Sequence, residues 1–291
     1  MEQKDIFYDD DFNIYLISPF EQVEMVSVHL SFTIIMSANI FHLDSSKYID
    51  KGKGEVLVLL HGLFSNLANF QHTVNYFSKK YRTIVPFFPL TELSLDKANI
   101  DGLVQYLESL LNALKIEKCT IIGNSLGGHV GIEYTLKHLQ RVNALVLTGS
   151  SGLFEKSNAT QEIPKRGNYE YIQQKTQTTF YNPDLATKEI VDEVFEIVND
   201  RSKAIKVLNI AKSAVRNNIS LQLAKLNIPV LLIWGENDQI TPPSIANEFY
   251  RLIPNAQLAW INKCGHSAMM ERPNRFNELL DEFLRSLKQI N

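Results

Sequence analysis

The chain has 291 residues, enough for one large domain or for a core domain with a modest insertion. Hydrophobic residues make up 45% of it and charged residues 21%, which is the profile of an ordinary soluble globular protein. The formal net charge is -3, from 29 basic and 32 acidic residues without a long basic run, so nucleic acid is not an expected partner.

Residues 1–35 are predicted to be an N-terminal extension of uncertain status. The run from Val23 to Met36 is apolar, but it is too short and too often interrupted by polar residues for a membrane-spanning helix. It follows the acidic "YDDDF" and not the basic segment of a secretory signal. We expect either an extra strand-like extension or a segment upstream of the true start at Met36, and no membrane span.

Four apolar runs between residues 36 and 150 are typical of buried strands. Helical patterns follow two of them, at Asn99–Leu114 and directly after Ser125. Continuous apolar strands that alternate with amphipathic helices indicate a parallel sheet covered on both faces. The predicted strands are Glu55–Leu60, Arg82–Phe88, Cys119–Gly123 and Ala144–Gly149.

This alternation stops between residues 151 and 224, where only helical patterns occur. They cover Tyr169–Phe180, Thr187–Val198 and Ser202–Arg216. A helical block inserted into an α/β core is typical of a cap over a binding site, and the alternative is a set of ordinary structural helices. The α/β pattern then resumes over residues 225–291, so the predicted core consists of residues 36–150 and 225–291. Its last elements are strands at Val230–Gly235 and Leu258–Ile261 and helices at Ser244–Ile253 and Asn274–Leu287.

The motif "GNSLGG" places Ser125 between a predicted strand and a predicted helix, with glycines two residues before and after it. This G-x-S-x-G pattern is typical of a sharp strand-to-helix turn that exposes a nucleophilic serine. A serine hydroxyl needs a base, and the base needs an orienting group. His266 follows the last apolar strand and is the predicted base, and Asp238, in "WGENDQITPP", is the predicted orienting carboxylate, with Glu236 as its alternative.

A serine nucleophile also needs donors for the oxyanion that forms when it attacks a carbonyl. "LLHGLFSN" turns sharply after the first strong strand, so the backbone N–H groups of Leu63 and Leu126 are the predicted donors. The side chains of Leu63 and Phe64 are expected to line the acyl pocket.

No cofactor or metal site is expected, since the sequence lacks a metal-ligand cluster, a phosphate loop and a dinucleotide fingerprint. The two cysteines, Cys119 and Cys264, do not form a disulfide framework and favour a reducing, cytoplasmic setting.

In "HGLF", "GNSLGG", "GENDQITPP" and "CGHSAMMERP", which occur in this order, the chain resembles the α/β-hydrolase superfamily over about residues 50–291. The resemblance implies a mostly parallel, eight-stranded sheet with helices on both faces and a helical cap at residues 151–224. It also implies the nucleophile, acid, base and oxyanion roles given above.

Within that superfamily, the "GNS" form is similar to the meta-cleavage-product hydrolases, which break carbon–carbon bonds in vinylogous diketo acids. This likeness implies that Asn124, Arg216 and the residue after the base, Ser267, contact the substrate. The chain departs from that group because it lacks an "SGPG"-like run after the HG pair and has serine, not tryptophan, at position 267.

The leading hypothesis is therefore a serine hydrolase of small, hydrophobic carboxylic esters that forms an acyl-enzyme. The alternatives are a carbon–carbon bond hydrolase and a hydrolase-fold receptor for a small molecule. The expected partner is a small ester or related acyl substrate, and the sequence sets no oligomeric state.

Overall fold

The computed structural model describes residues 6–8, 14–16, 40–43, 46–64, 67–153 and 167–290. The chain divides into two units, residues 1–41 and 42–291. In the first unit, the short strands β1 (Ile6–Tyr8) and β2 (Ile14–Leu16) pair antiparallel. The rest of the predicted extension, including the apolar run from Val23 to Met36, lies outside the described residues.

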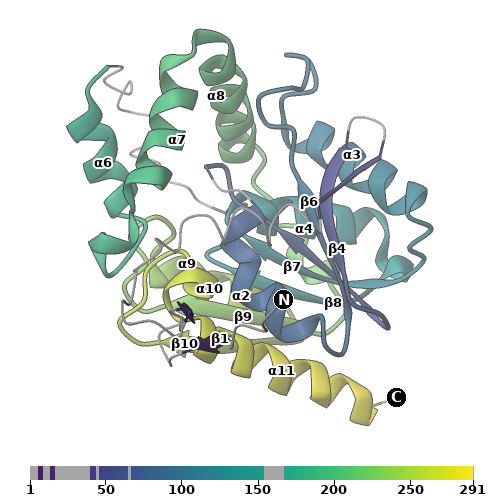
Figure 1. The fold of residues 1–291 in the computed structure, drawn as a ribbon. Helices are drawn as coiled ribbons and strands as arrows, with labels where there is room; N and C mark the ends of the chain where they lie inside the picture. Colours follow the sequence, from purple (N-terminus) through teal and green to yellow (C-terminus); the bar gives the residue numbers. More distant parts are fainter. Residues whose placement is uncertain are drawn as a thin grey trace. The chain divides into compact units, whose positions relative to one another are not determined.

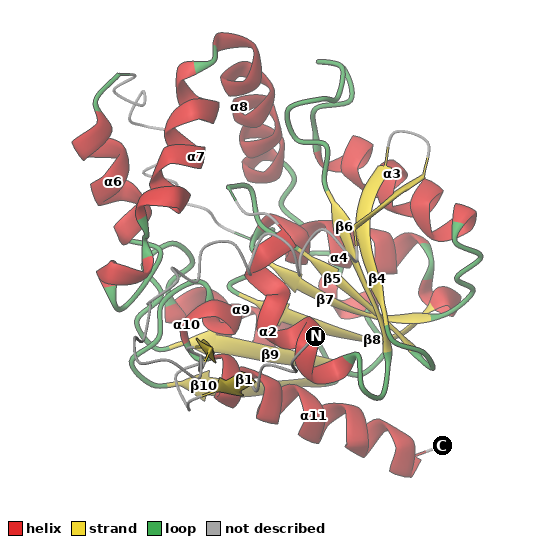
Figure 2. Ribbon diagram, viewed as in Figure 1, coloured by secondary structure: helices red, strands yellow, loops and turns green. Residues whose placement is uncertain are grey.

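The central sheet has eight strands in the order β10-β9-β8-β7-β5-β6-β4-β3. All pairs from β10 to β6 are parallel, whereas β4 runs antiparallel to β6. The predicted mostly parallel, eight-stranded sheet is confirmed (Figure 2). The strands are β3 (Ile40–Leu43), β4 (Ser46–Lys51), β5 (Val56–Leu60), β6 (Arg82–Phe87), β7 (Cys119–Asn124), β8 (Val142–Thr148), β9 (Val230–Gly235) and β10 (Ala256–Ile261).

Helices cover both faces of this sheet, which explains why its inner strands are mostly apolar and buried (Figure 1). Alternate strand residues such as Val58, Ile121 and Leu232 belong to one core that also contains buried residues of three helices that pack directly on the sheet, and of a fourth helix described below. The first three are α3 (Ile100–Ala113), α4 (Leu126–Lys137) and α9 (Pro243–Leu252). The helices α2 (Gln71–Phe77) and α11 (Pro273–Ile290) contact each other and further strands of the sheet.

Residues 167–224, here called the helical insertion, hold three α-helices: α6 (Tyr169–Gln177), α7 (Lys188–Asn199) and α8 (Arg201–Arg216). The first two share a small apolar cluster with Phe180 and with Met270, which lies outside the insertion. Tyr169 and Tyr171 pack in the same cluster, so these two aromatic side chains help to hold α6 and α7 together. The helix α8 packs into the main core through Val207, Ile210 and Ala214.

The order of the strands fixes where a binding site can form. In the sheet, β5 lies between β6 and β7, so the strand that follows β5 is on one side of it and the next strand is on its other side. The carboxyl ends of strands at such a reversal leave a crevice, which is the usual ligand site of open α/β sheets. The segments that begin at His61 and at Ser125 leave the sheet at this position. Within the described part of the chain, no helix is long and apolar enough to cross a membrane.

Candidate active site

Ser125 occupies the turn between β7 and α4 with φ 55° and ψ -120°, a conformation that L-residues rarely adopt. Its N–H donates to the Thr148 carbonyl at 3.1 Å, which anchors the turn on the neighbouring strand. A Cβ at Gly123 would lie 2.5 Å from the Gly127 carbonyl oxygen, and one at Gly127 would lie 2.2 Å from that of Leu60. The motif therefore needs both glycines because backbone approaches backbone on either side of Ser125.

The structure brings His266 and Asp238 into contact. The ring Nδ1 of His266 lies 2.9 Å from Asp238 Oδ2, and both side chains are buried. Asp238 also accepts from the N–H groups of Ile240 and Thr241 at 2.8 and 2.9 Å and from the Thr241 hydroxyl at 2.9 Å. A carboxylate with these donors accepts the Nδ1–H of histidine and leaves Nε2 free to take a proton. Glu236, the alternative carboxylate, is exposed.

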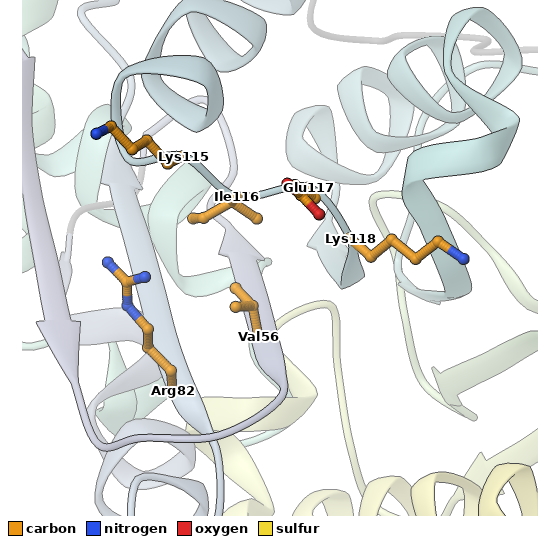
Figure 3. Close-up of a pocket in the computed structure, with 6 residues that line it drawn as sticks. All are labelled: Val56, Arg82, Lys115, Ile116, Glu117 and Lys118. Carbon is orange, nitrogen blue, oxygen red and sulfur yellow. The ribbon is translucent and has the colours of Figure 1, made fainter.

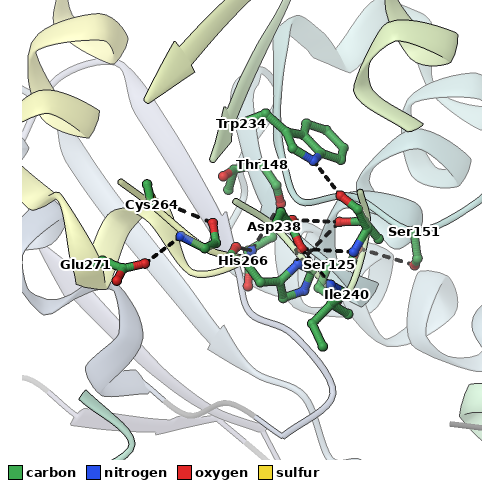
Figure 4. A network of polar contacts seen from close by, with 12 residues as sticks. Ser125, Thr148, Ser151, Trp234, Asp238, Ile240, Cys264, His266 and Glu271 are labelled. Atoms are coloured by element: carbon green, nitrogen blue, oxygen red, sulfur yellow. Dashed lines mark hydrogen bonds and ion pairs between the residues drawn. The ribbon is translucent and has the colours of Figure 1, made fainter. Parts of the chain in front are cut away.

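A second set of hydrogen bonds joins the loop of His266 to the turn of Ser125 (Figure 4). The Asn124 side-chain amide donates to the carbonyl of Thr148 at 3.0 Å and to that of His266 at 3.2 Å. A Cβ at Gly149 would lie only 2.7 Å from His266 Nδ1, so the end of β8 also packs directly on the ring. Among the described residues, no hydrogen bond joins the Ser125 hydroxyl to His266. Catalytic hydrogen bonds of this kind often form only once substrate is bound.

The loop after β5 is held by His61. Its Nε2 accepts the Phe88 N–H at 3.0 Å, so its Nδ1 carries the proton and donates to the Gly62 carbonyl at 2.8 Å. Burial lowers the pKa of His61 to about 4, which keeps the ring neutral near pH 7. This contact fixes the main chain immediately before Leu63.

The two predicted oxyanion donors are both available. Leu126 is the first residue of α4, where N–H groups have no acceptor inside the helix. In the described ranges, neither the Leu63 N–H nor the Leu126 N–H donates to another group of the protein. Ser65 and Asn66, which continue the loop after Phe64, lie outside the described residues.

The predicted substrate contacts lie in different surroundings. Phe64 leaves 42% of its surface exposed after the β5 turn, and Arg216 is an exposed residue at the end of α8. Ser267 is buried directly before the short helix α10 (Ala268–Glu271). The amide nitrogen of Asn124 is engaged with two carbonyls, so only its oxygen remains for a ligand.

Thr241 was not predicted from the sequence, although its hydroxyl contacts both members of the Asp238–His266 pair, at 2.9 and 3.2 Å. The Trp234 indole N–H donates to the Thr241 carbonyl at 2.8 Å and holds the residue in place. Its only sequence signal is its position three residues after Asp238.

A cavity of about 430 Å³ lies elsewhere in the fold (Figure 3). Its lining residues include Val56 and Arg82, the first residues of β5 and β6, and the loop before β7. It therefore opens at the amino ends of these parallel strands, whereas Ser125 lies at the carboxyl end of β7. The cavity is separate from the candidate active site.

The sequence matches the alpha/beta hydrolase fold family over residues 55–196 and 194–273. With the sheet, the Ser125 turn and the order of the site segments described above, this match shows that the chain belongs to the alpha/beta hydrolase fold family.

Three relatives illustrate the range of this similarity. The chain is 40% identical to an alpha/beta hydrolase enzyme from the metagenome of lagoon sediments at Mar Chica, Morocco, whose crystal structure gives a TM-score of 0.71 and covers 85% of this chain and 98% of that one. It is 29% identical to a 2-hydroxy-6-oxononadienedioate/2-hydroxy-6-oxononatrienedioate hydrolase of Burkholderia vietnamiensis, over 82% of this chain and 90% of the relative. It is 27% identical to a monoacylglycerol lipase of Bos taurus, over 79% of this chain and 75% of the relative.

Proposed function

We propose that the protein is a serine hydrolase that cleaves hydrophobic carboxylic esters through an acyl-enzyme. One observation carries the proposal: a buried His266 that is hydrogen-bonded to Asp238 and tied by Asn124 to the turn of Ser125. The unused N–H groups of Leu63 and Leu126 support it, because they supply the donors that such a reaction needs.

In the first half of the proposed reaction, Ser125 Oγ attacks the ester carbonyl and its proton passes to His266 Nε2. Asp238 stabilises the imidazolium without taking the proton. The carbonyl oxygen becomes an oxyanion held by the Leu63 and Leu126 N–H groups. When the intermediate collapses, the bond to the alcohol breaks and His266 gives its proton to the departing oxygen.

In the second half, water attacks the acyl-enzyme while His266 Nε2 takes one of its protons. The bond from the carbonyl carbon to Ser125 Oγ then breaks, and His266 returns the proton to the serine. The products are a carboxylic acid and the free enzyme. No residue changes its net protonation over the cycle.

We propose that the helical insertion serves as the cap over this site and that Phe64 contributes to the acyl pocket. The exposed ring of Phe64, close in sequence to the Leu63 donor, supports an apolar acyl group. The likeness to a monoacylglycerol lipase supports the same substrate class.

The second candidate is hydrolysis of a carbon–carbon bond in a vinylogous diketo acid. The 29% identity to a hydrolase of 2-hydroxy-6-oxononadienedioate favours it, as does the asparagine before the nucleophile. The cation that such a substrate needs would come from Arg216 at the end of α8. Serine at position 267, where this group usually has tryptophan, argues for the ester.

A labelling experiment and a substrate panel test the proposal. A fluorophosphonate probe should modify Ser125, and the Ser125→Ala and His266→Ala variants should not be labelled. A series of p-nitrophenyl esters of increasing acyl length is then compared with a vinylogous diketo acid. Preference for the longer esters supports the proposal, whereas dominant turnover of the diketo acid supports the second candidate.

Modification of a different residue by the probe would overturn the nucleophile assignment. Negligible turnover of every substrate, together with a rise in melting temperature when a ligand is added, would favour a receptor.

A further inference from the structure

Glu271, at the end of α10, is a buried carboxylate that accepts three backbone N–H groups. Its Oε2 accepts from Gly265 at 2.5 Å and from Tyr181 at 3.1 Å, and its Oε1 accepts from Asn182 at 2.7 Å. Gly265 directly precedes the proposed base, whereas Tyr181 and Asn182 belong to the helical insertion. One side chain therefore connects the insertion to the main chain beside His266.

The same two segments also contact each other without Glu271. The His266 N–H donates to the Thr179 carbonyl at 2.8 Å. A Cβ at Gly265 would lie 2.7 Å from that oxygen and 2.8 Å from the Tyr181 nitrogen, so only glycine permits this approach. Residues 179–181 thus lie against the backbone of the histidine loop, and Asn182 is joined to it through Glu271.

We propose that Glu271 is a positioning residue, which locks residues 179–182 of the insertion onto the His266 loop and so holds the base in register with Ser125. The inference rests on the proposed function, since it assigns the base role to His266. It goes further because the position of the base then depends on the position of the insertion. If residues 179–182 move, His266 moves with them, since the His266 main-chain N–H is bonded to the Thr179 carbonyl.

Three donors around one side chain require a carboxylate. Glutamine has one acceptor oxygen, and its NH2 group would face either the Asn182 N–H or the pair from Gly265 and Tyr181. Each arrangement leaves at least one backbone N–H without its acceptor and places two donors together. The Glu271→Gln substitution therefore disturbs the contact with almost no change of volume.

Kinetics of the full-length Glu271→Gln protein give the first test. Since a displacement of about 1 Å at a reacting group can cost roughly 100-fold in rate, kcat for a p-nitrophenyl ester should fall by roughly 10- to 100-fold. The Michaelis constant should change less than about threefold, because the acyl pocket is untouched. The control is Asp200→Asn, which removes a carboxylate that accepts the Ser202 and Lys203 N–H groups inside the insertion, away from His266. It should leave kcat unchanged.

Two measurements without substrate separate this inference from the proposed function. The first is amide hydrogen exchange at residues 179–182, and the second is the downfield proton resonance of His266 Nδ1 in its hydrogen bond with Asp238. In Glu271→Gln, exchange should accelerate and the resonance should broaden or disappear. Gly265→Ala, which pushes the same segments apart by its Cβ, should show both changes.

The outcomes are distinct. If the wild type does not hydrolyse esters but Glu271→Gln still alters the amide exchange and the His266 resonance, the positioning role stands and the proposed ester hydrolase activity is rejected. An active wild type with unchanged kcat, exchange and resonance in Glu271→Gln would overturn the positioning role. A lower melting temperature with an unchanged resonance and kcat would show a purely structural carboxylate and would also overturn it.

Discussion

The side-chain nitrogen of Asn124 donates to the main-chain carbonyl of His266 at 3.2 Å, across 142 positions of sequence. A second bond, to the Thr148 carbonyl at 3.0 Å, completes its donor capacity. The residue before the proposed nucleophile is thereby fixed to the residue proposed as its base. The asparagine of "GNS" sets the distance between two loops, and its nitrogen is not free for a substrate.

Replacing Asn124 with aspartate should separate these loops, because a carboxylate cannot donate and would face two carbonyl oxygens. We expect kcat/KM for an ester to fall by roughly 10- to 100-fold, mainly through kcat. Steady-state kinetics with a thermal melt to confirm folding provide the measurement. A rise in the Michaelis constant alone, with kcat intact, would instead identify Asn124 as a substrate contact.

Thr241→Val should weaken the orientation of the base, since it removes a hydroxyl that lies 2.9 Å from Asp238 Oδ2 and 3.2 Å from His266 Nδ1. A hydrogen bond to a charged group contributes about 1.5–3 kcal/mol, so kcat/KM should drop by roughly 10- to 100-fold. Asp238 retains its two backbone donors, which should preserve the fold.

Thr241→Ser is the matched control because it keeps the hydroxyl and removes only a methyl group. It should restore most of the activity lost in the valine variant. Equal losses in both variants would assign the effect to packing and not to the hydroxyl.

The sequence predicted the elements whose signal is local. The inner strands β5 to β9 are continuous apolar runs, and their predicted bounds lie within two residues of the observed ones. The strand β4, "SKYIDK", has only two apolar residues, Tyr48 and Ile49, and lies at the side of the sheet where pairing turns antiparallel, so it lacks the apolar run of the inner strands and was not predicted. The helix α2 was also missed, since its seven residues follow a turn-rich loop.

The site shows the same division. Ser125, Asp238 and His266 stand in short motifs with a chemical reason for each residue type. Thr241 and Glu271 make contacts that only the folded chain creates, such as the approach of residues 179–181 to Gly265. No pattern within the motifs predicts which neighbouring carboxylate or hydroxyl those contacts will use.

Arg216→Ala should discriminate between the two candidate reactions. The guanidinium is exposed at the end of α8, so its removal should not disturb the core. If the protein cleaves neutral esters, we expect the Michaelis constant to change less than about twofold. For a diketo acid that the arginine binds, the loss of a charged contact would raise the constant by roughly 10-fold or more. The comparison uses one preparation with both substrates, and a large effect on the neutral ester would contradict the first candidate.

Stability should fall as the solution is acidified below about pH 6.5, because burial lowers the pKa of two histidines. Burial lowers the pKa of His61 and of His129 from 6.5 to about 4. Between these values, the unfolded chain binds protons that the folded chain does not, so the free energy of unfolding rises with pH. Each histidine should contribute up to roughly 1.4 kcal/mol per pH unit, and this contribution ends near pH 4.

His129→Leu tests this assignment, since leucine keeps the buried position filled and cannot bind a proton. Urea unfolding at pH 7, 6 and 5 should give a slope that is smaller than in the wild type by up to roughly 1.4 kcal/mol per pH unit. Val130→Ala, at the next buried position of α4, is the control, because it should lower stability by a similar amount at every pH. A slope that is unchanged in His129→Leu would mean that the ring takes up its proton equally in the folded and unfolded protein, and that the acid sensitivity arises from other groups.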